Sequence, residues 1–246
     1  MTVSKWRLIP LIVATGAEQM AIDRWLLAQH AQGLQPSSLR FYEWRSPTIS
    51  LGYHQHQFPP HWKTLHYNDQ PVDIVRRPTG GRAVLHQGDL TYALVTSGLQ
   101  GSRRSVYRQL CQFLIDGWRQ LGIDLSLGSA GRSYIKNPNC FGSATSADLV
   151  MADGYKLIGS AQVYREGCVL QHGSMRLQTD MDLFEAVFGE ASFSSDSSDS
   201  SDRPLATYKT ADIINALVTA ARSTFNVDFD LKPLTPAERK QAIAET

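Results

Sequence analysis

DLVMADGYKLIGSAQVYREGCVLQHGSMRL, residues 148–177, is the stretch of sequence that decides the fold. It holds three short runs of strand-forming residues separated by two turns. Asp153-Gly154 is a dipeptide that tight hairpin turns prefer, and Glu166-Gly167 supplies a second turn. The stretch therefore predicts a three-stranded antiparallel meander.

The sequence before the meander predicts helices and further strands. Apolar residues recur at helical spacing in two segments, 16–32 and 102–121. Strands are predicted at 39–44, 48–53, 73–77, 82–86 and 90–96. We expect the last two of these strands to form a hairpin around residues 87–89. An irregular stretch rich in Gly, Ser, Asn and Pro follows at 128–145.

The sequence after the meander contains a low-complexity segment, SFSSDSSDSSD at 192–202. With so few apolar side chains, this segment is expected to form a flexible loop. A helical tail, 203–246, is predicted to follow, with one helix near 210–225. Thr235-Pro236-Ala237-Glu238 is a capping box that begins a second helix. The whole chain, 1–246, is thus expected to form a single α+β domain: a mixed, antiparallel-rich sheet flanked by helices.

Composition and charge exclude several classes of function. The chain has 246 residues, of which 42% are hydrophobic and 19% charged, as in ordinary globular enzymes. A net charge of +1 predicts no nucleic-acid partner and no anionic membrane surface. No apolar run reaches the roughly 18 residues of a membrane span. The three cysteines form no CxxC motif, so we expect no disulfide framework and no metal site, and free thiols fit the cytoplasm.

The segment RRPTGGRAVLH, residues 76–86, joins two predicted strands through a double glycine. Gly80 and Gly81 allow the backbone to approach a ligand closely and to expose successive N–H groups. Arg77 and Arg82 flank them and could hold a phosphate or a carboxylate. A glycine turn with arginines on the surface is the alternative reading, and both remain open from the residues alone.

The segment KLIGSAQ, residues 156–162, combines a lysine at the start of a strand with three small residues. Gly159, Ser160 and Ala161 leave room beside the strand for a slender ligand. His172 lies on the next strand of the meander and is expected beside them. A solvated surface charge is the alternative for Lys156.

Cys140 lies in the irregular stretch before the meander, where a loop can present a reactive group. A thiol becomes a good nucleophile as a thiolate, and a nearby cation favours that form. Lys156 or His172 could supply this cation. Cys111, next to an apolar helical stripe, and Cys168, in a hairpin, are expected to be structural.

Taken together, these segments resemble the biotin/lipoate A/B protein ligase family, and most closely its cysteine-dependent octanoyltransferases that act on glycine-cleavage H protein. The matching segments occur in the family's order and cover roughly residues 5 to 180. They are MAIDRWLL (20–27), LRFYEW (39–44), PTISLGYHQ (47–55), RRPTGGRAVLH (76–86), LTY (90–92), CF (140–141), DL (148–149), KLIGSAQVYR (156–165) and LQHGS (170–174).

The resemblance implies a role for each site residue. Cys140 would carry the acyl group as a thioester, and Lys156 would hold the acyl carbonyl. The acyl pocket and substrate-binding positions would be Arg77, Gly80, Gly81, Arg82, His86, Gly159, Ser160, Ala161 and His172. Arg82 also favours a transferase, because the ligases tend to have a small residue there.

The resemblance further implies the partners and the cofactors. Octanoyl-acyl carrier protein would be the donor, and a lysine of a lipoyl-domain protein, such as H protein or a 2-oxoacid dehydrogenase subunit, the acceptor. No cofactor or metal would be needed. Three rival activities stay open: an ATP-dependent lipoate–protein ligase, an amidotransferase that moves the acyl group between lipoyl domains, and an inactive acyl- or lipoyl-binding protein. Biotin ligation fits the sequence least.

Overall fold

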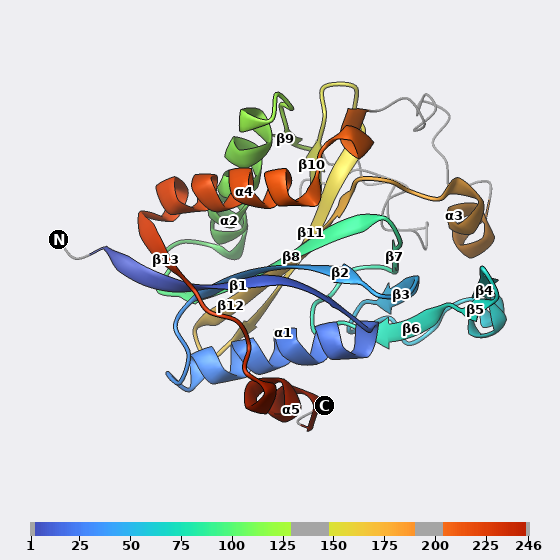
Figure 1. Cartoon of the computed structure of the whole chain (residues 1–246), viewed down its shortest axis with the longest axis horizontal. Coiled ribbons are helices and arrows are strands. Elements are labelled where there is room, and N and C mark those ends of the chain that lie inside the picture. The colour runs from blue at the N-terminus through green and yellow to red at the C-terminus, as the bar shows by residue number, and fades with distance from the viewer. Residues whose placement is uncertain (1–2, 129–147, 190–203, 245–246) are drawn as a thin grey trace.

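The computed structural model of the chain describes residues 3–128, 148–189 and 204–244. Its main feature is an eight-stranded sheet (Figure 1). In chain order, the strands of this sheet are β1 (Ser4–Ala14), β2 (Ser38–Trp44), β8 (Asp89–Ser97), β9 (Ser126–Leu127), β10 (Asp148–Val150), β11 (Lys156–Arg165), β12 (Cys168–Arg176) and β13 (Val227–Leu231).

The strands are arranged in the order β13-β1-β2-β8-β12-β11-β10-β9. β13, β1 and β2 run parallel to one another. Every later neighbour in the sheet is antiparallel. The predicted fold class, a mixed and antiparallel-rich sheet flanked by helices, is confirmed.

The predicted meander is also confirmed, as β10, β11 and β12. Glu166 and Gly167 connect the last two strands with positive φ angles of 49° and 78°, as a type I′ turn requires. The register of β11 and β12 pairs Ala161 with His172. The small residues of β11 and the histidine of β12 are therefore direct neighbours.

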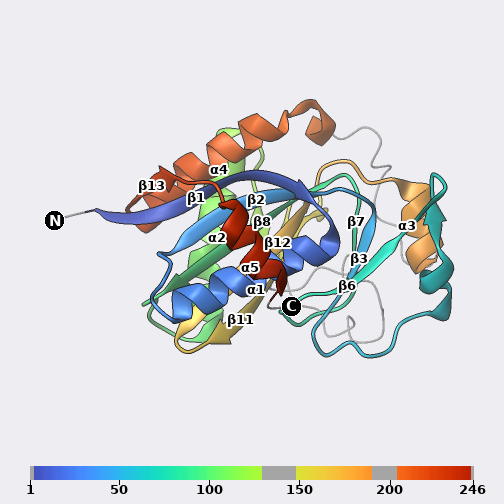
Figure 2. The ribbon, with the colours of Figure 1, turned by 60° about the horizontal axis from the view of Figure 1, so that its bottom comes forward.

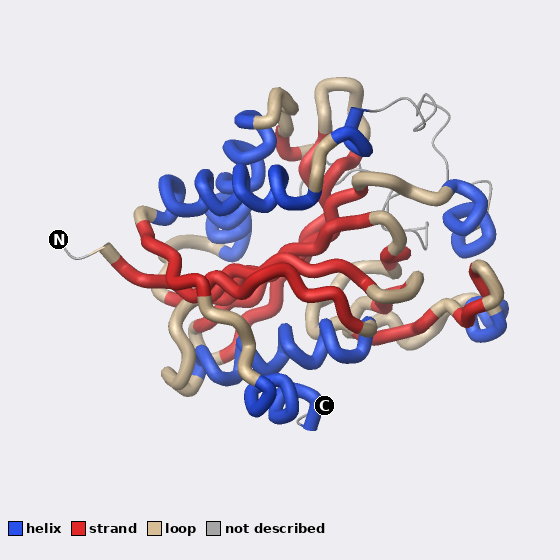
Figure 3. The backbone as a smooth tube through the Cα atoms, viewed as in Figure 1, coloured by secondary structure: helices blue, strands red, loops and turns tan. Residues whose placement is uncertain are grey.

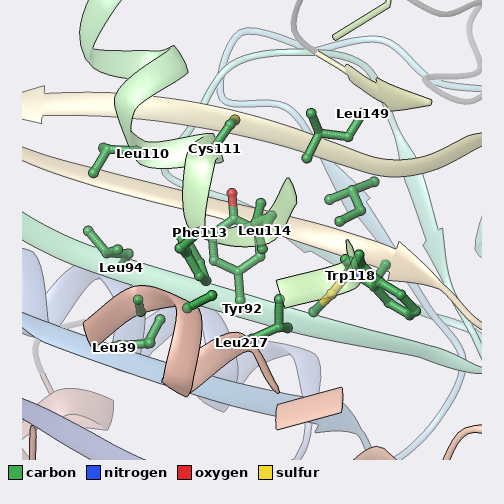
Figure 4. Packing of buried hydrophobic residues seen from close by; sticks show 14 of the residues in the cluster. Leu39, Tyr92, Leu94, Leu110, Cys111, Phe113, Leu114, Trp118, Leu149 and Leu217 are labelled. Carbon is green, nitrogen blue, oxygen red and sulfur yellow. The ribbon is translucent and has the colours of Figure 1, made fainter. Parts of the chain in front are cut away.

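Helices cover both faces of the sheet (Figures 2 and 3). α2 (Arg103–Gln120) and α4 (Thr210–Phe225) cover one face, and α1 (Gly16–Ala31) and α5 (Pro236–Ala244) the other. The larger apolar core lies under α2 and α4 (Figure 4). There Gly117 allows close helix packing, because a Cβ at this position would lie 3.0 Å from the Leu217 Cα.

A smaller unit lies at one end of the large sheet. Its elements are β3 (Thr48–Leu51), β6 (Asp73–Arg76), β7 (Val84–His86), the two-residue strands β4 (His66–Tyr67) and β5 (Gln70–Pro71), the 3-10 turn η1 (Pro60–Thr64) and α3 (Met181–Phe188). Buried Trp62 and Phe184 belong to its own apolar core. The sequence reading did not identify α3.

The predicted hairpin of 82–86 with 90–96 is wrong. β7 pairs with β3 in the three-stranded sheet, whereas β8 lies in the large sheet. Both edges of β8 are already occupied by β2 and β12, so β7 has no free edge to join. The intervening turn is instead tied to the segment after β12, because the Gln178 N–H donates to the Gly88 carbonyl at 2.9 Å.

The C-terminal segment 203–246 contains more than the predicted helices. It begins with the 3-10 turn η5 (Pro204–Thr207), and β13 follows α4 and pairs in parallel with β1. The alternating sequence VDFDL could have revealed this strand. The capping box of α5 is confirmed: the Glu238 N–H donates to Thr235 Oγ1 at 3.1 Å, and the Thr235 N–H to Glu238 Oε2 at 2.8 Å. Buried Arg7 of β1 donates to the same Glu238 carboxylate, which fixes α5 on the sheet.

Candidate functional site

A narrow cavity of about 80 Å³ lies between the meander and the β6–β7 connection. Eight of the predicted site residues line it: Arg77, Gly80, Gly81, His86, Gly159, Ser160, Ala161 and His172. Two others, Arg82 and Lys156, are not among its lining residues. The fold therefore brings the RRPTGG segment and the small-residue strand to one cavity, and the binding of substrate by these residues stays a prediction.

The double glycine shapes one wall of this cavity. Gly81 has a φ of +99°, a conformation that side chains disfavour. Its carbonyl oxygen lies so close to Gly52 that a Cβ at position 52 would overlap it. Gly80, in contrast, has open space where a side chain would be. Glycine is therefore required at 52 and 81 for backbone geometry, while Gly80 leaves the cavity wall open.

Arg77 is buried and holds the glycine connection in place. Its guanidinium donates to the carbonyl oxygens of Ser50 and Gly80, both at 2.8 Å, and of Arg82 at 2.7 Å. The alternative that this arginine is a surface residue is wrong, since its exposed fraction is 6%. Its contact with substrate stays a prediction.

His86 belongs to a buried hydrogen-bonded chain. Its Nε2 lies 2.8 Å from the Ser50 hydroxyl, and its Nδ1 lies 2.8 Å from Asp89 Oδ2. Arg77 donates to the same hydroxyl at 3.2 Å, so the Ser50 proton points to His86 Nε2, and Nδ1–H donates to Asp89. Burial lowers the pKa of His86, although Asp89 acts in the opposite direction. The ring is thus neutral at pH 7, stacked on Trp44 at 3.8 Å.

His172 belongs to a second chain of the same kind. Its Nε2 lies 2.6 Å from the Thr79 hydroxyl, and its Nδ1 lies 2.8 Å from Asp23 Oδ2. Arg40 and Tyr42 donate to the same carboxylate at 3.0 and 3.1 Å. Burial acts to raise the pKa of Asp23, but Arg40, His172 and Tyr42 outweigh it, so the pKa lies below its usual value. Asp23 is a carboxylate that fixes the ring of His172.

Sequence reasoning missed the hydroxyl and carboxylate partners of both histidines. Asp23 carried a usable signal, because it is an acidic residue whose helical neighbours three or four positions away, Met20, Leu26 and Leu27, are apolar and buried. Ser50, Thr79 and Asp89 carried none, since serine, threonine and aspartate are ordinary residues near strand ends and turns.

Lys156 is buried at the start of β11, with an exposed fraction of 5%. Its Nζ lies 2.9 Å from Oδ1 of Asp148 on the neighbouring strand β10. The alternative of a solvated surface charge is therefore wrong. Lys156 lies outside the small-residue segment, because it precedes Gly159 by three residues, which is about 10 Å along a strand.

The small residues of β11 are matched by a glycine on β12. A Cβ at Gly173 would lie 2.7 Å from the Gly159 carbonyl oxygen, so no larger residue fits there. The Ser160 hydroxyl lies 2.9 Å from the Tyr92 hydroxyl, which accepts a hydrogen bond from Gln171 at 2.8 Å. This wall of the cavity therefore presents a hydroxyl at Ser160 and only small residues at Gly159, Ala161 and Gly173. Contact with an acyl tail stays a prediction.

The three cysteines differ in what the structure shows. Cys140 lies outside the described residues, as does the Ser/Asp-rich segment 192–202. Cys111 and Cys168 are buried free thiols. Burial raises the pKa of Cys111 to about 12, with hydrogen bonds from Tyr107 and Gln171 acting against it. Cys111 is therefore a thiol at neutral pH, in the core drawn in Figure 4.

Two kinds of feature are absent from the described ranges 3–128, 148–189 and 204–244. Within these ranges no group of three or more His, Cys, Asp or Glu side chains could hold a metal ion. Nor does any helix within them have the length and apolar character needed to cross a membrane.

Comparison with solved structures defines the class of fold. Lipoate-protein ligase A bound with ATP superposes with a TM-score of 0.77 at 22% identity, covering 99% of this chain and 94% of that one. A bi-partite lipoate protein ligase from Thermoplasma acidophilum gives 0.71 at 21% identity, covering 98% and 91%. The fold is that of lipoate-protein ligases.

Comparison with sequences defines the family. Residues 15–222 match the lipoyl protein ligase A/B catalytic domain, and the chain belongs to this family. Octanoyltransferase LipM of Kyrpidia tusciae is 37% identical over 204 residues, which cover 78% of this chain and 72% of the relative. Octanoyltransferase LipM of Lysinibacillus sphaericus is 34% identical over 244 residues, covering 90% and 86%. The resemblance expected from the sequence is confirmed.

Proposed function

We propose that this chain is an octanoyltransferase of lipoate biosynthesis, which moves octanoyl from acyl carrier protein through a Cys140 thioester to a lysine of a lipoyl-domain protein. The observation that carries the proposal is the narrow cavity bounded by Gly80, Gly159, Ala161 and Gly173. It suits an unbranched apolar tail, whose burial contributes about 0.8 kcal/mol per methylene. The relatives named octanoyltransferases support the same activity.

The reaction has two steps. In the first, the Cys140 thiolate attacks the donor thioester, the new C–S bond forms, and the carrier's thiolate leaves and takes up a proton. In the second, the acceptor's lysine amine attacks the Cys140 thioester, the C–N bond forms, and Cys140 leaves as a thiolate. The amine loses one proton to a base. The first step is near thermoneutral and the second is downhill, so ATP is not required.

Lys156 would stabilise the negative charge that develops on the carbonyl oxygen. A buried cation acts strongly on such a charge because little water screens it. Its ion pair with Asp148 keeps the ammonium in place until substrate arrives. Asp148 directly follows the segment that carries Cys140. Proximity of Cys140 and Lys156 is part of this proposal.

His86 is the base that the geometry favours for the acceptor amine. Its neutral ring accepts from Ser50, and both residues line the cavity. A proton taken up by the Ser50 oxygen can pass to His86 Nε2, while Asp89 stabilises the resulting imidazolium. His172 is arranged in the same way with Thr79 and Asp23, and is the second base that we predict.

The experiment that tests the activity is intact-mass measurement after incubation with octanoyl-carrier protein. We expect one added octanoyl group that hydroxylamine removes. Cys140→Ala should lose the adduct, whereas Cys168→Ala, a matched control, should keep it. An adduct that persists in Cys140→Ala would show that another residue is the nucleophile.

A donor comparison separates this proposal from the rival ligase. Octanoyl-carrier protein should support transfer to a lipoyl-domain acceptor without nucleotide. Transfer that requires free octanoate with ATP and Mg²⁺, and that survives Cys140→Ala, would instead establish a ligase. Octanoyl transfer from one lipoyl domain to another would establish an amidotransferase. The compartment that we propose is the cytoplasm, which suits the free thiols Cys111 and Cys168.

A further inference from the structure

A second, larger cavity lies beside the proposed acyl site and is rich in arginine. It has a volume of about 860 Å³ and shares two lining residues, Arg77 and Gly80, with the acyl cavity. Five arginines line it, and no Asp or Glu is among its described lining residues. The five are Arg24, Arg76, Arg77, Arg103 and Arg165.

Two of these arginines, Arg24 and Arg76, are half-buried. Arg24 donates to the Arg76 carbonyl at 3.2 Å, and Arg76 donates to the Gly52, Tyr53 and Gln55 carbonyls at 2.8, 3.2 and 2.8 Å. Within the described part of the chain, neither makes an ion pair with a carboxylate. Backbone carbonyl oxygens orient the two guanidinium groups, and the neighbouring Asp23 carboxylate offsets part of the charge of Arg24.

Two others form the exposed rim. Arg103 begins α2 and lies 5.1 Å over the Tyr164 ring, which orients it without neutralising it. Arg165 ends β11, with its Nε 3.4 Å from the exposed Glu166 carboxylate, a solvent-screened pair. The floor between rim and interior is apolar, with contributions from Trp25 and Val163.

We propose that this arginine groove docks the phosphate-bearing thiol arm of the acyl donor, delivered by a carrier protein with an acidic surface. The inference rests on the proposed function and names the donor's binding surface. Arg24 and Arg76 face the phosphodiester of the arm, and the apolar floor receives its aliphatic part. The arm then reaches the acyl cavity past Arg77 and Gly80, which line both cavities.

The number and position of the arginines indicate that the arm arrives attached to a carrier protein and not as a small free thioester. One phosphodiester carries a single negative charge, which the half-buried Arg24 and Arg76 satisfy. Arg103 and Arg165 are exposed at the rim, where they can only meet charges outside the arm. Carboxylates on the carrier's surface complement them and speed the encounter.

The test compares three donors: octanoyl-carrier protein, octanoyl-coenzyme A and the phosphate-free octanoyl-N-acetylcysteamine. Arg24→Gln should lower kcat/KM for both phosphate-bearing donors, relative to the phosphate-free donor, by about tenfold. Arg103→Glu should lower kcat/KM for the carrier-protein donor alone, again relative to the phosphate-free donor, by about fivefold at low salt. Arg104→Glu is the matched control, because this exposed neighbour on α2 does not line the groove.

Each outcome decides the assignment. Unchanged ratios in Arg24→Gln, or an equal loss in Arg104→Glu and Arg103→Glu, would overturn the groove as the docking site. A loss in Arg103→Glu that is as large with octanoyl-coenzyme A would overturn the carrier protein as the occupant of the rim. In these cases the wild-type chain still transfers octanoyl, and the proposed function stands. If the wild type accepts octanoyl from none of the three donors, both proposals fall.

Discussion

Asp23 is the residue whose loss should reveal most about how the site is held together. It is fully buried and accepts hydrogen bonds from Arg40, Tyr42 and His172. In Asp23→Ala, the buried guanidinium of Arg40 would lose its carboxylate, and its Nη1 already has no hydrogen-bond partner among the described residues. Removing one member of a buried ion pair costs about 3–5 kcal/mol, because the other charge stays desolvated. This is a large part of a domain's stability of about 5–15 kcal/mol.

Urea and thermal unfolding measure this loss directly. For a chain of this size, each kcal/mol shifts Tm by about 2–4 °C, so we expect a decrease of roughly 6–20 °C. Asp116→Ala is the matched control, since Asp116 pairs with Arg119 on the surface at 3.0 Å and should contribute at most about 1 kcal/mol. Asp23→Ala/Arg40→Met should be more stable than Asp23→Ala alone. Equal losses in Asp23→Ala and Asp116→Ala would refute the reasoning.

Three further predictions concern the cavity walls, one histidine and one helix cap. Gly173→Ala should lower stability by about 1–3 kcal/mol, because its Cβ would lie 2.7 Å from a backbone oxygen. Gly80→Ala should not lower stability, because the space beside Gly80 is open. Similar unfolding midpoints for the two variants would contradict the crowding at position 173. Because burial lowers the pKa of His86, the unfolded chain binds its proton first, so stability should be highest above pH 6.5 and fall as the pH decreases through the folded pKa. Urea unfolding between pH 7.5 and 5 should show that the free energy of unfolding decreases less in His86→Gln than in wild type. The exposed control His66→Gln should decrease as much as wild type. Identical decreases in all three proteins would count against a buried neutral ring. Thr235→Ala should lower stability by about 1 kcal/mol through loss of the α5 cap, and an unchanged Tm would argue against that cap.

Much of the fold was predictable because its signals are local. The meander follows from two turn dipeptides, in which Gly154, Glu166 and Gly167 adopt positive φ angles, and the capping box of α5 follows from residues three positions apart. Helices α1, α2 and α4 follow from apolar spacing along contiguous residues. Such patterns depend on the conformation of a few neighbouring residues, which the sequence specifies directly.

Strand pairing between distant segments was less predictable. β7 joins β3 instead of its neighbour β8, and β13 joins β1 from the other end of the chain. The choice depends on which sheet edges are already filled, and that is a property of the assembled fold.

For the site, the turns of the meander determined that the small residues of β11 lie beside His172, and the resemblance to a known family indicated that the double-glycine connection joins them. Only the tertiary structure decided the charge states and partners of these groups. Asp23 lies 149 residues before His172, and Lys156 is a buried ion pair instead of a solvated charge. The physical reason is desolvation. The charge state of a buried group depends on all the groups packed around it, and these come from positions that are far apart in the sequence.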